Sequence, residues 1–238
     1  MIGVEDPGRA VFKRRMILRA IVHPVVLLPL LGALLFVPAG SADWPMGWSV
    51  LGVYLTGMGL FNLLVILRDP ALAMERVKPP EGTKKWDRTL TQLANIPICL
   101  ILPLAGVDRR FGWTPPLAWP VQVGALVGLA LALVLIGWAM MSNRFFSSLV
   151  RIQAERGHTV VSGGPYRYVR HPAYLGLLAM PLTAALALGS LWSLICGAAA
   201  GCLYIVRTVL EDRALREELP GYLEYARKVR YRLLPRIW

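Results

Sequence analysis

The chain alternates between long apolar runs and short polar connections. Its six runs of Leu, Val, Ile and Ala hold almost no charge, and each is about 17–25 residues long, the length of a helix that crosses the hydrocarbon core of a bilayer. We therefore predict six membrane helices. They cover residues 17–39, 48–67, 90–106, 117–141, 173–189 and 191–209.

Composition supports this interpretation. Hydrophobic residues make up 56% of the 238 residues and charged residues 17%, whereas a soluble domain carries about 25% charged residues. The expected fold class is all-α: a polytopic membrane helix bundle of about six transmembrane helices, with a C-terminal helical hairpin and a cytoplasmic cofactor site.

The net charge of +12 does not indicate nucleic-acid binding, because the basic residues flank apolar runs. In the six-span arrangement, 24 of the 26 Lys and Arg residues fall on one side, and only Arg109 and Arg110 fall on the other. The positive-inside rule then predicts that both termini are cytoplasmic. The membrane would be the inner membrane of a bacterium or the endoplasmic reticulum of a eukaryote.

Two long polar connections divide the chain. Residues 1–142 hold the first four spans and an interfacial loop, 68–89, in which Pro70 favours a short helix over 70–77. Residues 143–238 hold the second connection, the helical hairpin 173–209 and a charged tail from Leu210. The unusual polar residues are concentrated in this C-terminal region.

Several kinds of site are excluded or disfavoured. Neither a Walker loop nor a G-x-G-x-x-G motif occurs, so a cofactor would need a non-Rossmann site. Three scattered histidines make a poor metal site. Cys99, Cys196 and Cys202 lie in apolar runs and are typical of buried small side chains. His23, alone inside the first span, favours a structural role.

The segment 158–176 is polar between two apolar runs. Gly163-Gly164-Pro165 predicts a sharp turn, and Pro172 suits the first turn of the next helix. His171 would then lie at the start of that helix, near backbone N–H groups that are free to bind an anionic group. Tyr174 follows on the same face, and Gly176 allows a neighbouring helix to approach.

The predicted hairpin brings distant residues to this segment. Arg207 and Glu211 are four residues apart and share a helix face, and the hairpin returns them to the boundary that carries His171 and Tyr174. An acid, an imidazole, a guanidinium and a phenol would converge there. Taken singly, these residues could be headgroup anchors, and Arg207 and Glu211 could form a local ion pair.

The pattern G-P-Y-R-Y-V-R-H-P-A-Y-L-G, followed by a hairpin and by E-D-R-A-L-R-E-E-L-P-G-Y-L-E-Y, resembles the isoprenylcysteine carboxyl methyltransferase family and the related phospholipid N-methyltransferases. The resemblance covers about residues 143–238. It implies S-adenosylmethionine as methyl donor, bound between the hairpin ends and the tail, and an acceptor-facing role for Arg207. The residues that it implies for the cofactor are Gln153, His158, Thr159, Val160, Val161, Tyr166, His171, Pro172, Ala173, Tyr174 and Glu211. One departure is Asp212, where the family has a second Glu.

The predicted function is methyl transfer to a lipophilic acceptor that enters from the bilayer. A carboxylate acceptor needs a cation such as Arg207, whereas an amine must lose a proton to a base such as Glu211 or His171. Two alternatives stay open. One is an NADPH-dependent reductase of the sterol-reductase type, with Arg167 and Arg170 for a 2′-phosphate. The other is a non-enzymatic transporter or interaction protein, which the lack of inverted repeats disfavours.

Overall fold

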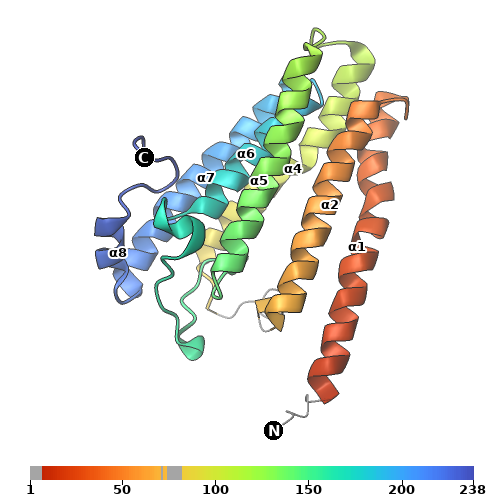
Figure 1. The fold of residues 1–238 in the computed structure, drawn as a ribbon. Coiled ribbons are helices and arrows are strands. Elements are labelled where there is room, and N and C mark those ends of the chain that lie inside the picture. The colour runs from red at the N-terminus through yellow and green to blue at the C-terminus, as the bar shows by residue number, and fades with distance from the viewer. Residues whose placement is uncertain (1–6, 71, 74–81) are drawn as a thin grey trace.

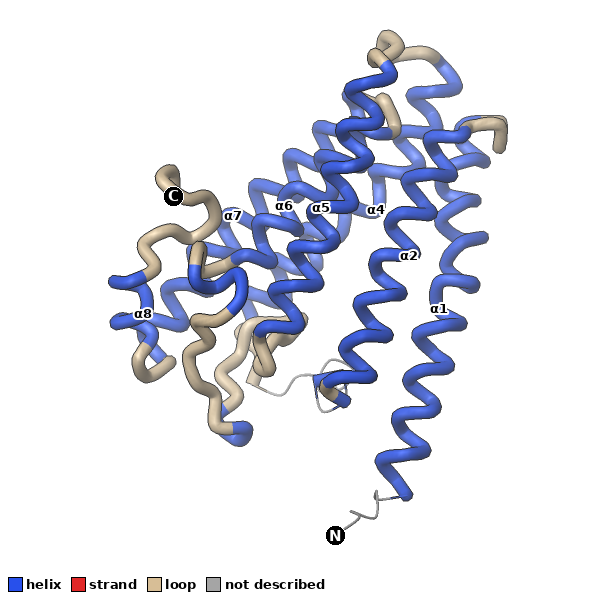
Figure 2. Tube along the Cα trace, viewed as in Figure 1, coloured by secondary structure: helices blue, strands red, loops and turns tan. Residues whose placement is uncertain are grey.

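The structure is a computed structural model, and it describes residues 7–70, 72–73 and 82–238. Its long helices run side by side as an elongated bundle (Figure 1). No strand occurs among the described residues (Figure 2). The predicted all-α class is confirmed.

Six long helices make up the bundle in this described part of the chain. They are α1 (Pro7–Ala39), α2 (Pro45–Arg68), α4 (Lys85–Phe111), α5 (Trp119–Ser142), α6 (Pro172–Ala187) and α7 (Leu191–Glu218). Each predicted span lies on one of these helices, and no predicted span extends past the end of its helix by more than two residues. Three short elements flank the bundle at one end: η1 (Ala154–Arg156), η2 (Gly164–Arg167) and α8 (Tyr222–Lys228).

Helices α2, α4, α5 and α7 are long and apolar enough to cross a membrane, and Pro24–Ala39 and Pro172–Ala187 are shorter apolar segments. Helix α6 has 16 residues, so at about 1.5 Å per residue it is shorter than a bilayer core of about 30 Å. Apolar side chains also cover much of the outer surface. The protein is therefore a polytopic helical membrane protein.

The turn between α6 and α7 is as tight as predicted. Gly189 has a φ of 71°, which glycine adopts without steric cost, and it ends α6. The Ser190 side chain caps α7 by accepting a hydrogen bond from the Ser193 N–H. The buried Asp108 of α4 accepts hydrogen bonds from Ser190 Oγ at 2.5 Å and Thr114 Oγ1 at 2.6 Å. This contact joins the hairpin to the α4–α5 turn at the end of the bundle far from α8.

The charged tail differs from the prediction, because α7 continues to Glu218 instead of ending near residue 209. The added turns carry i,i+4 ion pairs, Arg213 with Glu217 at 2.8 Å and Arg216 with Asp212 at 3.0 Å. Such pairs favour helix over coil. Within the loop 68–89, residues 71 and 74–81 lie outside the described residues. Residues 70, 72 and 73 of the helix predicted over 70–77 are helical, and the rest of that helix lies outside the described residues. The side chain of His23 is also outside them.

Glycines allow the helices of the C-terminal region to pack closely. A Cβ atom at Gly176 of α6 would lie 2.8 Å from the Ala132 carbonyl oxygen and 2.5 Å from Ile136 Cγ1 of α5. The predicted close approach at Gly176 is thus confirmed. Gly124 of α5, by contrast, has no atom within 4 Å of such a Cβ position.

We expect Gly176→Ala to lower the free energy of unfolding by about 1–3 kcal/mol, because α5 backbone must move to admit the methyl group. Gly124→Ala is the matched control and should change it by less than about 1 kcal/mol, since alanine is the better helix former. Thermal unfolding in detergent, followed by tryptophan fluorescence, measures both. Equal midpoints for the two variants would contradict the close packing described.

Candidate active site

A cavity of about 180 Å³ is lined by residues of the connection 143–171, α6, α7 and α8. The connection and α8 lie at the same end of the bundle (Figure 1). The cavity walls come from that connection, from the start of α6, from the last three turns of α7 and from α8. Phenylalanine and tyrosine rings alternate with cationic side chains and one carboxylate. The lining residues include Phe145, Arg151, Tyr166, Arg170, Tyr174, Glu211, Tyr222 and Tyr225.

Ten of the twelve predicted site residues line this cavity. They are His158, Thr159, Val160, Val161, Tyr166, His171, Ala173, Tyr174, Arg207 and Glu211. The central spatial prediction is confirmed, because the α6–α7 hairpin brings His171, Tyr174, Arg207 and Glu211 to one place. The connection 145–151 also lines the cavity, which the sequence analysis did not predict.

The other two predicted residues, Gln153 and Pro172, are buried outside the lining. Gln153 Nε2 donates to the Phe145 carbonyl at 2.7 Å, and its Oε1 accepts from Arg156 Nη1 at 2.5 Å. Gln153 therefore shapes the connection from behind the wall, and its contact with a cofactor stays a prediction. Pro172 occupies the first turn of α6, as expected from the sequence.

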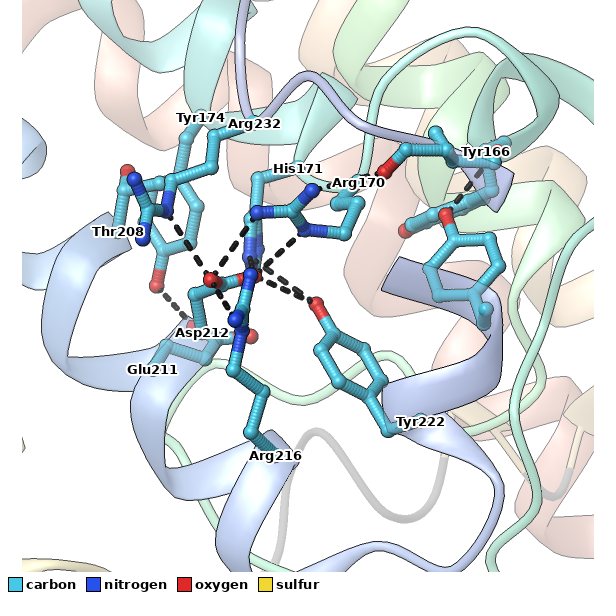
Figure 3. Close-up of polar contacts among 12 residues, drawn as sticks. Tyr166, Arg170, His171, Tyr174, Thr208, Glu211, Asp212, Arg216, Tyr222 and Arg232 are labelled. Carbon is cyan, nitrogen blue, oxygen red and sulfur yellow. Dashed lines mark hydrogen bonds and ion pairs between the residues drawn. The ribbon is translucent and has the colours of Figure 1, made fainter. Parts of the chain in front are cut away.

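Asp212 is fully buried and accepts hydrogen bonds from several cations (Figure 3). Arg170 donates through Nε at 2.7 Å and Nη2 at 3.1 Å, and Arg216 and Arg232 each donate through Nε at 3.0 Å. Tyr222 OH donates at 3.0 Å, and His171 Nε2 lies 3.3 Å away. The residue that departs from the family pattern is thus the centre of a buried charge cluster.

Its neighbour Glu211 has a different environment. It is only partly buried, it lines the cavity, and its Oε2 accepts a 2.5 Å hydrogen bond from Tyr174 OH. Two adjacent acids on α7 therefore have different contacts (Figure 3): Asp212 accepts hydrogen bonds from three arginines and Tyr222, and Glu211 accepts one from Tyr174. Only Glu211 lines the cavity.

Arg207 pairs with Asp87 and not with Glu211 in a local ion pair. Its Nε and Nη2 donate to the two Asp87 carboxylate oxygens at 2.6 and 3.0 Å, and Nη2 also donates to the Ser148 carbonyl at 2.9 Å. The guanidinium lies 5.4 Å from the centre of the Tyr174 ring. Sequence analysis missed Asp87. The available signal was a single acid among Lys84, Lys85 and Arg88, just before an apolar run.

Two backbone N–H groups just before α6, where free groups were expected, are occupied. Arg170 N–H donates to the Tyr231 carbonyl and His171 N–H to the Arg232 carbonyl, each at 2.9 Å. The C-terminal segment 229–238 therefore covers this helix end, and Arg170 Nη1 donates to two more of its carbonyls. The N–H groups of Arg170 and His171 are therefore not available to an anionic ligand group.

His158 and Tyr222 have shifted acidities. Burial, with the charges of Arg156 and Arg151, lowers the pKa of His158, and its Nδ1 accepts a 3.3 Å hydrogen bond from the Gln153 N–H. His158 is thus neutral near pH 7, with its proton on Nε2. Burial and the Asp212 carboxylate raise the pKa of Tyr222, so its hydroxyl keeps the proton that it donates.

Fold and cavity together define a polytopic helical membrane protein with a polar, aromatic-lined site at one end of its bundle. Residues 121–219 match the family model described as phospholipid methyltransferase, a family related to the isoprenylcysteine carboxyl methyltransferases. The match includes α5, the connection 143–171, α6 and α7, and the last three of these supply most of the residues that line the cavity. It confirms the resemblance predicted from the motifs. No curated protein matches the chain.

We expect Asp212→Asn to lower the free energy of unfolding by about 3–5 kcal/mol, because it leaves the buried Arg170 guanidinium without its counter-charge. Glu211→Gln should cost less than about 1 kcal/mol, since an amide oxygen can still accept from Tyr174. Thermal unfolding of both variants in detergent tests this difference. A larger loss for Glu211→Gln than for Asp212→Asn would show that the two roles are reversed.

Acidification should destabilise the protein partly through His158. Its folded-state pKa is lowered, so below about pH 6.5 the unfolded chain takes up a proton at this residue more readily than the folded protein does. The free energy of unfolding contributed by His158 is present above that pH and is lost below it. The unfolding midpoint of His158→Gln should therefore fall less between about pH 7 and pH 5 than that of the wild type. Parallel declines would refute this contribution.

Proposed function

We propose that the protein is an S-adenosylmethionine-dependent methyltransferase of a lipophilic acceptor. The observation that carries the proposal is the meeting of Glu211, Tyr174 and His171 in one cavity at the end of apolar helices, within the segment that matches a methyltransferase family. The family match and the helices support a membrane methyltransferase. The methyl donor and the acceptor class are the proposed details.

The cavity offers partners for each polar group of the donor. The Glu211 carboxylate suits the donor's ammonium or ribose hydroxyls, as a charge-assisted acceptor. Arg151 lines the cavity, where its Nη1 pairs with the Glu155 carboxylate at 2.9 Å, and it is the cation that we propose for the donor's carboxylate. The rings of Phe145, Tyr166 and Tyr174 suit the sulfonium cation and the adenine, because aromatic faces attract cations and stack on bases.

The proposed reaction is an in-line displacement, in which the acceptor's lone pair forms a bond to the methyl carbon as the carbon–sulfur bond breaks. The protein contributes positioning and exclusion of water. For an amine acceptor, Glu211 is the proposed base, because it holds one hydrogen bond from Tyr174 and faces the cavity. For a carboxylate acceptor no base is needed, and Arg207 is the proposed orienting cation.

The contacts of Arg170 weaken the reductase alternative. Arg170 was a candidate partner for the 2′-phosphate of NADPH. In the structure its Nε, Nη1 and Nη2 donate to Asp212 and to the carbonyls of Val229 and Arg230. The residue is 4% exposed. A phosphate would therefore have to displace a buried ion pair, which is costly.

With the site at the end of the bundle where α1 begins, we place the cavity and the N-terminus on the cytoplasmic side, where most of the basic residues would lie. The acceptor would reach the cavity from the bilayer, with its lipid portion between apolar helices.

Purified protein should bind S-adenosylmethionine in isothermal titration, and should transfer a radiolabelled methyl group to total membrane lipid. Glu211→Gln should lower the transfer rate about tenfold or more, because the carboxylate contacts donor or acceptor. Glu217→Gln, on an exposed turn of α7, is the matched control and should keep wild-type activity. Binding of NADPH without binding of S-adenosylmethionine would favour the reductase alternative and reject this proposal.

A further inference from the structure

The sequence analysis gave Asp87 no role, and the environment of this acid is unusual for the first turn of a helix. It is fully buried, although Lys85 and Arg88 beside it are exposed. Its carboxylate accepts from Arg207 Nε and Nη2, and its Oδ2 also accepts a 2.7 Å hydrogen bond from the Val150 N–H. One side chain thus joins the start of α4, the cavity wall and α7.

A second contact reinforces this junction. The Lys84 N–H donates to the Val150 carbonyl at 3.2 Å, and the Lys84 ammonium pairs with Glu218 at the end of α7. The wall segment 148–150 is therefore held by α4 from one side and by Arg207 from the other, through the Ser148 carbonyl. Ser148, Leu149 and Val150 all line the cavity.

The pairing also controls a charge next to the proposed reacting groups. The Arg207 guanidinium lies over the Tyr174 ring, and the Tyr174 hydroxyl donates to Glu211. Without Asp87, Arg207 would be a buried cation with only the Ser148 carbonyl as an acceptor in the described part of the chain, and it would be attracted to Glu211, one helical turn away. Asp87 therefore keeps Glu211 available to the cavity by engaging Arg207.

We propose that Asp87 is a positioning residue of the active site: it holds Arg207 and the wall 148–150 in place, and so fixes the part of the cavity that receives the methyl acceptor. This inference rests on the proposed function. It gives Asp87, at the start of α4, a role in the use of the methyl acceptor. Asp87 lies outside both the motifs of residues 143–238 and the family match over residues 121–219.

The experiment measures methyl transfer from radiolabelled S-adenosylmethionine to total membrane lipid, and donor binding by titration, in Asp87→Asn. The isosteric amide keeps an oxygen for the Val150 N–H but removes the charge. We expect kcat/KM for the lipid extract to fall about tenfold or more, with the donor Kd within about twofold of wild type. Asp87→Glu, which restores the charge, should recover part of the loss.

A double-mutant cycle with Arg207 separates positioning from general stability. If Asp87 acts through Arg207, Asp87→Asn should add less than about twofold to the loss already caused by Arg207→Gln. Asp108→Asn is the matched control: it removes an equally buried acid from the other end of α4. It should lower the unfolding midpoint, yet leave kcat/KM within about threefold of wild type.

A third readout does not depend on activity. Phenylglyoxal modification of Arg207, detected by mass spectrometry of the intact protein's peptides, should rise in Asp87→Asn and not in Asp108→Asn, because only the first variant frees the guanidinium. The proposal would be overturned if the losses of kcat/KM caused by Asp87→Asn and Arg207→Gln multiplied in the double variant. It would also be overturned if Asp87→Asn weakened donor binding as much as it lowered kcat/KM for the lipid extract. If the wild type showed no methyl transfer but Asp87→Asn still increased the phenylglyoxal modification of Arg207, only the proposed function would be rejected.

Discussion

The end of the protein that holds the cavity depends on one buried carboxylate. Asp212 binds Arg170 at the start of α6, Arg216 on its own helix, Tyr222 on α8 and Arg232 in the C-terminal segment. A carboxylate at 0% exposure is stable only when cations and hydroxyls surround it, and here they come from four separate parts of the chain. The hairpin must therefore pack against the C-terminal tail for the charge of Asp212 to be neutralised.

The charged side chains around this cluster differ in whether they pair with another buried side chain or face the cavity. Arg170 and Arg207 each pair with a buried aspartate, so neither brings a full free charge to the cavity. Glu211 retains a carboxylate that meets the cavity and a single tyrosine hydroxyl. Pairing of the Arg170 and Arg207 guanidiniums with aspartates suits the methyl donor proposed above, which brings its own sulfonium cation, because an unbalanced cation nearby would oppose its binding.

Much of this arrangement followed from the residues alone. The six apolar runs gave the positions of the helices, since a bilayer admits only a narrow range of apolar lengths. Gly189-Ser190 gave the hairpin, and the spacing of His171, Tyr174, Arg207 and Glu211 then required them to meet. Not every position implied only by the family resemblance lines the cavity: His158 and Tyr166 do, whereas Gln153 lies behind its wall.

The sequence by itself determined the membrane helices, the hairpin and the residues gathered at one end, because apolar length and helical spacing are local properties. Only the tertiary structure decided which partner each charge takes. Asp87 is 120 residues from Arg207, and Asp212 collects donors from as far as 42 residues upstream and 20 downstream. Burial makes those pairings obligatory, and no local pattern specifies which of several nearby arginines meets which acid.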